Sequence, residues 1–345
     1  MTSVLIIDDS ALMRQMLTAA FATAHDFSVD TALDPLFALD KMKRRWPDVI
    51  VLDLEMPRMD GMTFLKKVMA ERPTPIVVCS TLTEKGAEAS VRAMAAGAVS
   101  VFPKNRLKAS QGAPEVQQAL VTMVREAAAS RLSALSVKPG PTAAVAAPST
   151  PEVSLVALGA STGGTIALEQ VLVALPEDVP PIVIVQHMPE KFTLAFAQRL
   201  DSLTKVRVHE AKGGEVLERG HVYIAPGGRH MSLVSDAGAL TTRVFDAPHV
   251  NRHKPSVDVL FNSVAKLVGS RTLAMLMTGM GDDGARGLLA LRQSGAMTVA
   301  QDEATSIVFG MPAEAIKLGA AQQVAPLHAL APLIAACRSA KQQAA

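Results

Sequence analysis

The stretch VLIIDD at residues 4–9, together with VIVLD at residues 49–53, decides the fold of the first third of the chain. Each is a short apolar run of the kind that forms a buried strand, and each ends in carboxylates. Because the strands of a parallel sheet deliver their carboxyl ends to one crevice, we expect Asp8, Asp9 and Asp53 to converge. Three carboxylates at one point repel each other unless a hard cation such as Mg²⁺ lies among them. The pattern predicts a parallel sheet whose edge suits phosphoryl transfer onto one of the acids.

Strand and helix patterns alternate five times around these two runs, which predicts a doubly wound α/β domain with helices on both faces of a parallel sheet. We expect strands near 4–8, 27–31, 48–53, 75–80 and 98–102. The amphipathic stretches between and after them predict helices near 11–24, 35–45, 61–70, 84–96 and 113–135.

The composition then changes at residues 136–152, which read SVKPGPTAAVAAPSTPE with four prolines and no periodic apolar pattern. This composition is typical of a semi-rigid linker. Strand and helix patterns resume at 153, with a different texture at 221–245 that predicts a β-hairpin. We therefore expect a first domain at 1–125, a helix end and linker at 126–152, and a second doubly wound α/β domain at 153–340. Its sheet is expected to be mainly parallel, with the hairpin as an insertion.

The bulk properties of the chain exclude several classes of protein. A length of 345 residues fits two or three domains. The formal charge of +2 predicts no nucleic-acid surface. No leader pattern and no apolar run of membrane-spanning length is present in the sequence, so we expect no membrane insertion. Two cysteines cannot make a disulfide framework and fit a reducing compartment, so the expected location is cytoplasmic.

The first domain carries further polar residues at the predicted carboxyl edge of its sheet. Asp53 opens the loop DLEMPRMDG at 53–61, whose proline and Asp-Gly pair favour a tight turn that leaves the Asp53 carboxylate accessible. Ser80 ends the fourth strand and Lys104 follows the fifth, so a hydroxyl and an ammonium group reach the same edge. The alternative is that the acids merely cap helices, as Asp9 and Ser10 would for the first helix.

Asp8, Asp9, Asp53, Ser80 and Lys104, with DLEMPRMDG, resemble the receiver domain of bacterial response regulators. The resemblance implies that Asp53 accepts phosphate from a sensor histidine kinase. It also implies Mg²⁺ held by Asp9, Asp53 and the backbone carbonyl of Glu55, with Asp8 acting through water. Ser80 and Lys104 would then sense the phosphate. Two positions depart from the family pattern: Asn105 stands where a proline usually follows the lysine, and Val101 stands at the switch aromatic, with Phe102 one place later.

The second domain opens with a strand that runs into GASTGG at 159–164 and then a helix pattern. A glycine on each side of Ser161 fits a nucleophile elbow, a sharp turn that exposes a serine at a helix N-terminus. Tight packing or a phosphate-binding turn would use the same small residues. A nucleophilic serine needs a base and an orienting acid. His187, at the end of the next strand, is the best-placed base, although an isolated histidine there is commonly a core residue.

The other candidates for the base and the acid are less distinct from the residues alone. His230 and His253 lie in polar loop contexts and are weaker candidates for the base. The strand at 271–278 ends in a glycine-rich turn that carries Asp282 and Asp283, and either could instead cap the following helix. The resulting order of serine, histidine and aspartate differs from that of the α/β-hydrolases, so the chemistry need not come with their fold.

The segments GASTGG, VIVQHMP, IAPGGRHM, PSVDVLF, MTGMGDDGARGL and FGMPAEAI together resemble the catalytic domain of chemotaxis protein-glutamate methylesterases. The resemblance spans about 153–338. It implies Ser161 as nucleophile, His187 as general base and then acid, and Asp283 rather than Asp282 as the orienting acid. Backbone N–H groups near Thr162 and Met280 would serve as oxyanion donors.

The two resemblances together imply a phosphorylation-activated serine esterase. Its substrates would be glutamate γ-methyl esters, and glutamines for deamidation, on the cytoplasmic helices of chemoreceptors. Its partners would be those methyl-accepting receptors and the kinase, and no metal is expected in the esterase site. The alternative from another class is a receiver-controlled regulator whose second domain binds protein or DNA without catalysis. A serine peptidase or general lipase is a further enzymatic alternative.

Overall fold

The computed structural model describes residues 1–81, 83–110, 113–132, 134 and 153–337. Within it the chain divides into two compact units, Met1–Leu132 and Ser133–Ala345. The predicted linker lies for the most part outside the described residues. Among the helices that the structure describes, none combines the length and the apolar character needed to cross a lipid bilayer.

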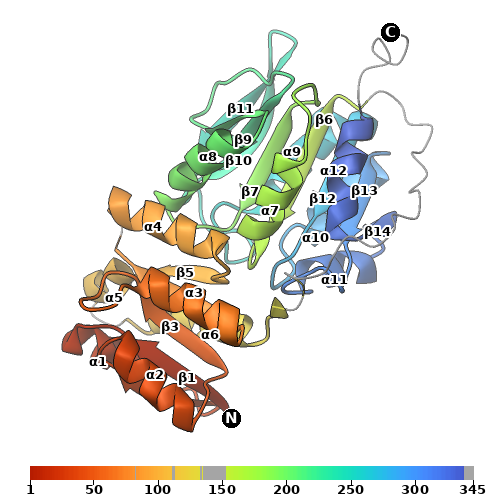
Figure 1. Cartoon of the computed structure of the whole chain (residues 1–345). Helices are drawn as coiled ribbons and strands as arrows, with labels where there is room; N and C mark the ends of the chain where they lie inside the picture. Colours follow the sequence, from red (N-terminus) through yellow and green to blue (C-terminus); the bar gives the residue numbers. More distant parts are fainter. Residues whose placement is uncertain (82, 111–112, 133, 135–152, 338–345) are drawn as a thin grey trace. The chain divides into compact units, whose positions relative to one another are not determined.

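The first unit is a five-stranded parallel sheet in the order β2-β1-β3-β4-β5 (Figure 1). Its strands are β1 Thr2–Ile7, β2 Phe27–Ala32, β3 Val49–Asp53, β4 Ile76–Ser80 and β5 Ser100–Pro103. All five residues of β3 and of β4 are buried, because helices cover both faces of the sheet. The doubly wound fold expected for this part of the chain is confirmed.

Four of the six helices described in the first unit begin at a residue whose side chain caps the helix. The six are α1 Ala11–Ala20, α2 Pro35–Arg44, α3 Gly61–Glu71, α4 Glu84–Ala95, α5 Lys104–Ala109 and α6 Pro114–Ala128. Ser10, Asp34, Asp60 and Thr83 each accept a hydrogen bond from a backbone N–H of the first turn, which stabilises a helix by about 1 kcal/mol. Helix α5 was not expected from the sequence. It has only six residues and starts directly after β5, so it leaves little periodic signal.

The second unit is built on a seven-stranded sheet in the order β14-β13-β12-β6-β7-β9-β8. All of its neighbouring strands run parallel. Its strands are β6 Leu155–Ala160, β7 Ile182–Gln186, β8 Arg207–Glu210, β9 His221–Ile224, β12 Thr272–Leu276, β13 Met297–Gln301 and β14 Gln323–Ala325. The separate hairpin joins β10 His230–Asp236 to β11 Ala239–Phe245.

The observed hairpin is therefore shorter than the segment 221–245 that was predicted to form it. Strand β9 pairs in parallel with β7 and β8 in the main sheet. The Gly227-Gly228 pair marks a close approach of two backbones, because a Cβ at Gly227 would lie 2.5 Å from the nitrogen of Glu190. The tight turn of the hairpin lies at Ala237 and Gly238, both of which have positive φ.

The seven-stranded sheet has helices on both faces. They are α7 Gly164–Val173, α8 Phe192–Leu203, α9 Val257–Leu267, α10 Ala285–Gln293, α11 Met311–Lys317 and α12 Leu327–Ala336. Helices α9, α10 and α11 share one core with the hairpin and one face of β6, β7 and β12. Helix α7 packs against α8 and α12. Neither α11 nor β14 was expected, since both are very short.

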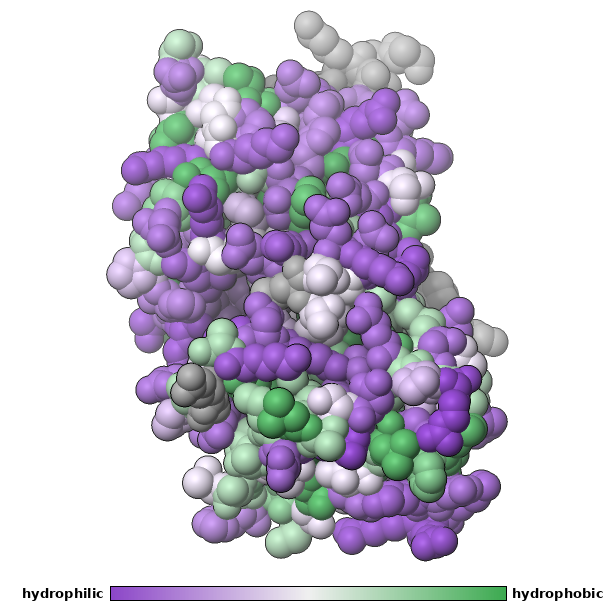
Figure 2. Space-filling view, turned by 90° about the vertical axis from the view of Figure 1, so that its left-hand side faces the viewer, coloured by the Kyte–Doolittle hydropathy of each residue, from purple (hydrophilic) through white to green (hydrophobic). Residues whose placement is uncertain are grey.

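The surface is mostly polar where Figure 2 shows it. On that face hydrophilic residues predominate, and hydrophobic residues appear in separate groups among them. The chain is 49% hydrophobic, so most of its apolar side chains must lie in the two cores. Burying a Leu, Ile or Val side chain fully contributes about 1.5–3 kcal/mol, so the fully buried strands β3 and β6 anchor the loops that follow them.

Candidate functional sites

The three acids at the carboxyl edge of the first sheet lie together. Strands β1 and β3 pair with Ile7 opposite Leu52, so Asp8 and Asp53 follow at the same level. Asp8, Asp9 and Asp53 each offer a carboxylate oxygen within 4.8 Å of the others. Asp8 and Asp53 are buried, whereas Asp9 is exposed and opens the group to solvent.

Lys104 lies between the two buried acids. Its ammonium nitrogen is 2.7 Å from Asp8 Oδ2 and 2.6 Å from Asp53 Oδ2. Burial raises the pKa of Asp53, and the charge of Lys104 offsets part of that rise. Three carboxylates and one ammonium leave two negative charges in excess. This all-oxygen donor set with a twofold negative excess fits a hard divalent cation such as Mg²⁺.

Glycine at position 61 allows the loop after β3 to close over Asp53. A Cβ there would lie 2.2 Å from the carbonyl oxygen of Asp53 and 2.7 Å from Cα of Leu54. The backbone N–H of Gly61 donates to the carbonyl of Leu54, and that of Glu55 donates to Asp53 Oδ1 at 3.2 Å. The loop DLEMPRMDG is thus held by its own backbone around the acid.

The remaining residues expected at this edge are also placed. The Ser80 hydroxyl donates to the carbonyl of Gly86 in the first turn of α4 at 3.1 Å. Ser10, not Asp9, caps α1, since its hydroxyl accepts from the N–H of Met13. At the two positions that depart from the receiver pattern, Asn105 lies in the first turn of α5, and Val101 and Phe102 are both buried in β5.

In the second unit, Ser161 and His187 follow directly from two neighbouring strands. Strands β6 and β7 pair with Ala160 opposite Gln186, so the next residue of each strand reaches the same edge. The side-chain amide of Gln186 donates to the carbonyl of Ser161 at 2.8 Å and to that of His187 at 3.3 Å. Gly163 has a φ of 78°, which turns the chain sharply from Ser161 into helix α7. This is the strand–turn–helix context expected of a nucleophile elbow.

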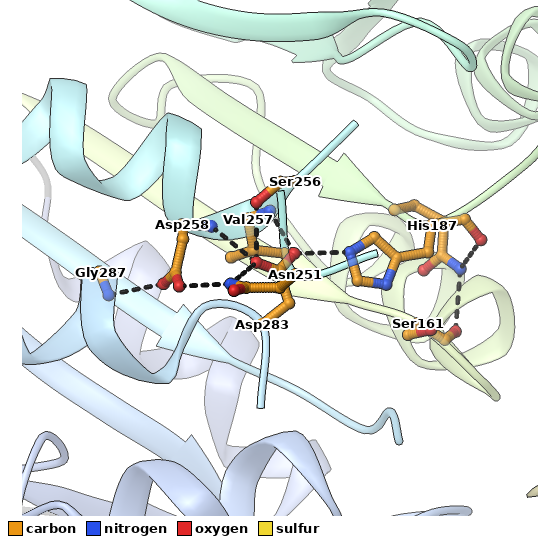
Figure 3. Close-up of polar contacts among 9 residues, drawn as sticks. Ser161, His187, Asn251, Ser256, Val257, Asp258, Asp283 and Gly287 are labelled. Atoms are coloured by element: carbon orange, nitrogen blue, oxygen red, sulfur yellow. Dashed lines mark hydrogen bonds and ion pairs between the residues drawn. The ribbon is translucent and has the colours of Figure 1, made fainter. Parts of the chain in front are cut away.

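His187 is paired with Asp283, and Figure 3 shows the imidazole between Asp283 and Ser161. His187 Nε2 lies 2.8 Å from Asp283 Oδ2. His187 Nδ1 is buried and has no hydrogen-bond partner among the described residues. Since a carboxylate accepts, Nε2 carries the proton, and Nδ1 is left as the nitrogen that can accept one.

Asp283 is held by a dense set of donors. Its Oδ1 accepts from Ser256 Oγ at 2.7 Å and from Asn251 Nδ2 at 2.8 Å, and its Oδ2 accepts from the N–H of Val257 at 2.7 Å. Burial alone would raise the pKa of Asp283, but its bonds to His187, Asn251 and Ser256 hold it well below its usual range. The carboxylate is therefore ionised and oriented by several fixed partners.

The structure separates the two neighbouring aspartates that the residues alone left open. Asp282 is exposed, whereas Asp283 is 1% exposed and contacts His187. Neither side chain caps α10, whose N-cap is Gly284 with a φ of 90°. The positive φ of Gly281 and Gly284 brackets the turn that points Asp283 inward.

Three residues of this network were not identified from the sequence as site residues: Asn251, Ser256 and Asp258. Asn251 Nδ2 donates to Asp258 Oδ2 at 2.7 Å as well as to Asp283, so it bridges two buried carboxylates (Figure 3). Burial and the charge of Asp283 raise the pKa of Asp258. The segment PSVDVLF contains Ser256 and Asp258, but nothing in its composition says which carboxylate it faces.

The two weaker histidine candidates have different surroundings. His230 is fully buried in β10, and its Nε2 lies 3.0 Å from the carbonyl oxygen of Pro248. The ring of His253 stacks on that of His187, with centroids 3.7 Å apart and planes 6° apart. His230 is thus a core residue, and His253 belongs to the site without replacing His187.

The two residues expected to supply oxyanion donors are Thr162, which follows Ser161 in the chain, and Met280, which lies in the loop after β12. The carbonyl of Thr162 accepts from Thr278 Oγ1 at 2.9 Å. Gly279 packs closely against Ser161, because a Cβ at Gly279 would lie 2.7 Å from Cβ of Ser161. Met280 is the next residue of that loop. The loop that carries Met280 is fixed because Gly310 and Met311 both donate to the carbonyl of Gly279.

Comparisons with known proteins agree with this division of the chain. The family model for the CheB methylesterase matches residues 156–334, and that for the response regulator receiver domain matches residues 4–110. A protein-glutamate methylesterase/protein-glutamine glutaminase of Xanthomonas oryzae is 52% identical over 94% of this chain and 98% of its own. A relative of the same description from Chromobacterium violaceum is 51% identical over 97% of this chain and 99% of its own.

A solved structure supports the same relationship for the second unit. The crystal structure of the catalytic domain of Thermotoga maritima CheB methylesterase matches with a TM-score of 0.52 and 37% identity. The match covers 53% of this chain and 97% of that domain.

Proposed function

The chain belongs to the CheB methylesterase family and carries a response regulator receiver domain before its catalytic domain; from this premise we propose that Ser161, His187 and Asp283 hydrolyse glutamate γ-methyl esters on chemoreceptors. The products are glutamate and methanol. The same site would deamidate receptor glutamines and release ammonia. The observation that carries the proposal is the buried His187–Asp283 pair at the end of the strand beside that of Ser161.

The mechanism follows from which imidazole nitrogen is free. His187 Nε2–H donates a hydrogen bond to Asp283, so Nδ1 is the base that takes the hydroxyl proton as Ser161 Oγ attacks the ester carbonyl. The bond to the methoxy oxygen then breaks, and Nδ1 returns the proton to it as methanol leaves. Water then attacks the acyl-serine and gives one proton to Nδ1. The bond between the acyl carbon and Ser161 Oγ breaks, Nδ1 returns the proton to Oγ, and glutamate leaves with Ser161 and neutral His187 restored. Asp283 stays ionised and stabilises the imidazolium.

The negative oxygen that forms in each tetrahedral step needs donors that do not move. We assign the backbone N–H groups of Thr162 and Met280 to this role. Met280 N makes no hydrogen bond in the part of the chain that the structure describes, which leaves it available to a substrate. Removing one such donor costs about 3 kcal/mol of transition-state stabilisation in a well-studied hydrolase.

The first unit is proposed to control the second through phosphorylation of Asp53 by a sensor histidine kinase. Asp8, Asp9, Asp53 and the backbone carbonyl of Glu55 would hold Mg²⁺, which when bound neutralises negative charge on the transferring phosphoryl group. Phosphate adds about −2 charge beside Lys104. The Ser80 hydroxyl donates to the first turn of α4. On phosphorylation it would exchange this hydrogen bond for one to a phosphate oxygen and so release that turn. The chain would act in the cytoplasm, where receptor helices and kinase meet it.

The proposal is tested by methanol release from methylated receptor membranes. Wild type and Ser161→Ala are compared, each with and without a small-molecule phosphodonor and Mg²⁺. Serine-dependent release that rises with the phosphodonor supports both the esterase and its control. If Ser161→Ala releases as much methanol as wild type, Ser161 is not the nucleophile. If wild type binds the receptors but releases no methanol, the protein is a binding regulator and not an esterase.

A further inference from the structure

The loop at residues 249–256 places a second histidine against His187. Val250 and His253 exchange two backbone hydrogen bonds, of 3.1 and 2.9 Å, which close the loop. Asn251 and Arg252 inside it both have positive φ, of 50° and 68°. This conformation is costly for arginine, so it persists only because the surroundings impose it. The loop is pinned to Asp283 on both sides of His253, by Asn251 and by Ser256.

This pinned loop presents a ring face, not a hydrogen bond, to His187. The two imidazoles are nearly parallel, with centroids 3.7 Å apart. Within the described residues the side chain of His253 makes no hydrogen bond. Its ring instead stacks on the ring of His187. His187 Nε2 is already bonded to Asp283 and its Nδ1 is left for Ser161, so the face of the ring is the part that His253 can influence.

The charge state of His253 suits this position. Burial, and after it the charge of the neighbouring His187, lower the pKa of His253 to about 3. Among the other charged groups that act on His253, Asp283 raises the pKa, whereas Arg252 and His249 lower it. The ring is therefore neutral near neutral pH. A neutral aromatic ring attracts a cation placed over its face, and the attraction is larger where water is excluded.

We propose that His253 is a positioning residue that fixes the plane of His187 and stabilises its imidazolium form by stacking. The inference rests on the proposed function, because the imidazolium arises only when His187 takes the proton of Ser161. It adds a fourth side chain to the catalytic group, one that acts on the general base and does not touch the reacting atoms.

The test compares replacements of His253 in the full-length protein that differ only in whether they offer a ring face. His253→Phe keeps a flat aromatic ring, and His253→Leu fills similar volume without one. We expect His253→Leu to lower kcat by about tenfold, with KM little changed, since a half-buried stack of this kind is worth on the order of one factor of ten. The acid limb of its kcat profile should move to lower pH by about one unit, because protonating His187 becomes harder. His253→Phe should stay within about threefold of wild type.

Controls separate this role from a structural one. His249→Leu removes an exposed histidine of the same loop that stacks on nothing in the described structure, and it should leave kcat and the pH profile unchanged. Thermal unfolding reports whether each variant folds, and His253→Met offers a second replacement without a ring if His253→Leu does not. Equal kcat and equal acid limbs for the Phe and ringless variants would overturn the proposal. Turnover that persists in Ser161→Ala would instead overturn the proposed function beneath it.

Discussion

Asp283 shows how much of the proposed catalytic geometry depends on a single carboxylate. It accepts from His187, Asn251, Ser256 and the N–H of Val257. Replacement by Asn would put an NH₂ group where only acceptors fit, and it would favour the wrong tautomer of His187. We expect Asp283→Asn to lower kcat by about 10³–10⁴-fold, as the equivalent change does in a serine protease. Steady-state methanol release measures the loss, and Asp282→Asn, at an exposed position, should remain close to wild type.

The choice between Asp282 and Asp283 also marks a limit of sequence reasoning. The glycine-rich turn MTGMGDDG indicates that a carboxylate is presented at a strand end, and the family resemblance selects Asp283. The residues alone could not, because neighbouring residues in a turn differ only in the direction that the backbone gives them. That direction is set by the positive φ of Gly281 and Gly284. Asn251 was missed for the same reason, since its role depends on where a distant loop lies.

Asp53 allows a prediction about stability with a definite sign. Its folded-state pKa is raised by burial, so the ionised carboxylate costs stability at every pH above its unfolded value of about 3.9, and the cost disappears as the pH falls below that value. At pH 7 we expect Asp53→Asn to raise the melting temperature of the first unit by roughly 2–6 °C. Added Mg²⁺ should stabilise the wild type more than the variant. Calorimetry of the full chain measures both, and a melting temperature lowered by the substitution would contradict the expectation.

At the scale of secondary structure, β6 and α9 meet at a glycine. A Cβ at Gly159 would lie 2.4 Å from Cγ1 of Val257, whose own N–H donates to Asp283. Gly159→Ala should push the start of α9 away from the carboxylate. Overpacking of this kind costs about 1–3 kcal/mol, and displacement of Asp283 should lower kcat by about 10–100-fold. Unfolding and turnover measured on the same preparation check both, and a fully stable, fully active variant would show that α9 does not position the site.

The elements that the sequence predicted well are those whose apolar residues recur at regular spacing over a long segment and those that start at a recognisable capping residue. Strand β3 and helices α1 and α9 carry such signals. Strand β14 has three residues and α5 has six, which is too short for periodicity to show. The sequence around β9 predicts a hairpin because the Gly227-Gly228 pair resembles a turn. Strand β9 instead pairs with β7 and β8 in the main sheet. A local sequence pattern does not indicate which distant strand will be the partner.

At the scale of the whole molecule, the two compact units predict that catalysis and its control can be separated. The second unit contains Ser161, His187, Asp283 and the whole core around α9 and α10, so residues 153–345 should fold and hydrolyse receptor methyl esters alone. If the unphosphorylated first unit restrains the esterase, this fragment should release methanol severalfold faster than the untreated full chain, and the phosphodonor should not change its rate.

The rate of the full chain should rise toward that of the fragment on phosphorylation, and the rate of Asp53→Asn should stay low. A coupling free energy of about 1–3 kcal/mol would give a change of about 5–150-fold. Methanol release from the same receptor membranes compares all three, and a fragment no more active than the untreated full chain would mean that phosphorylation activates without relieving any restraint.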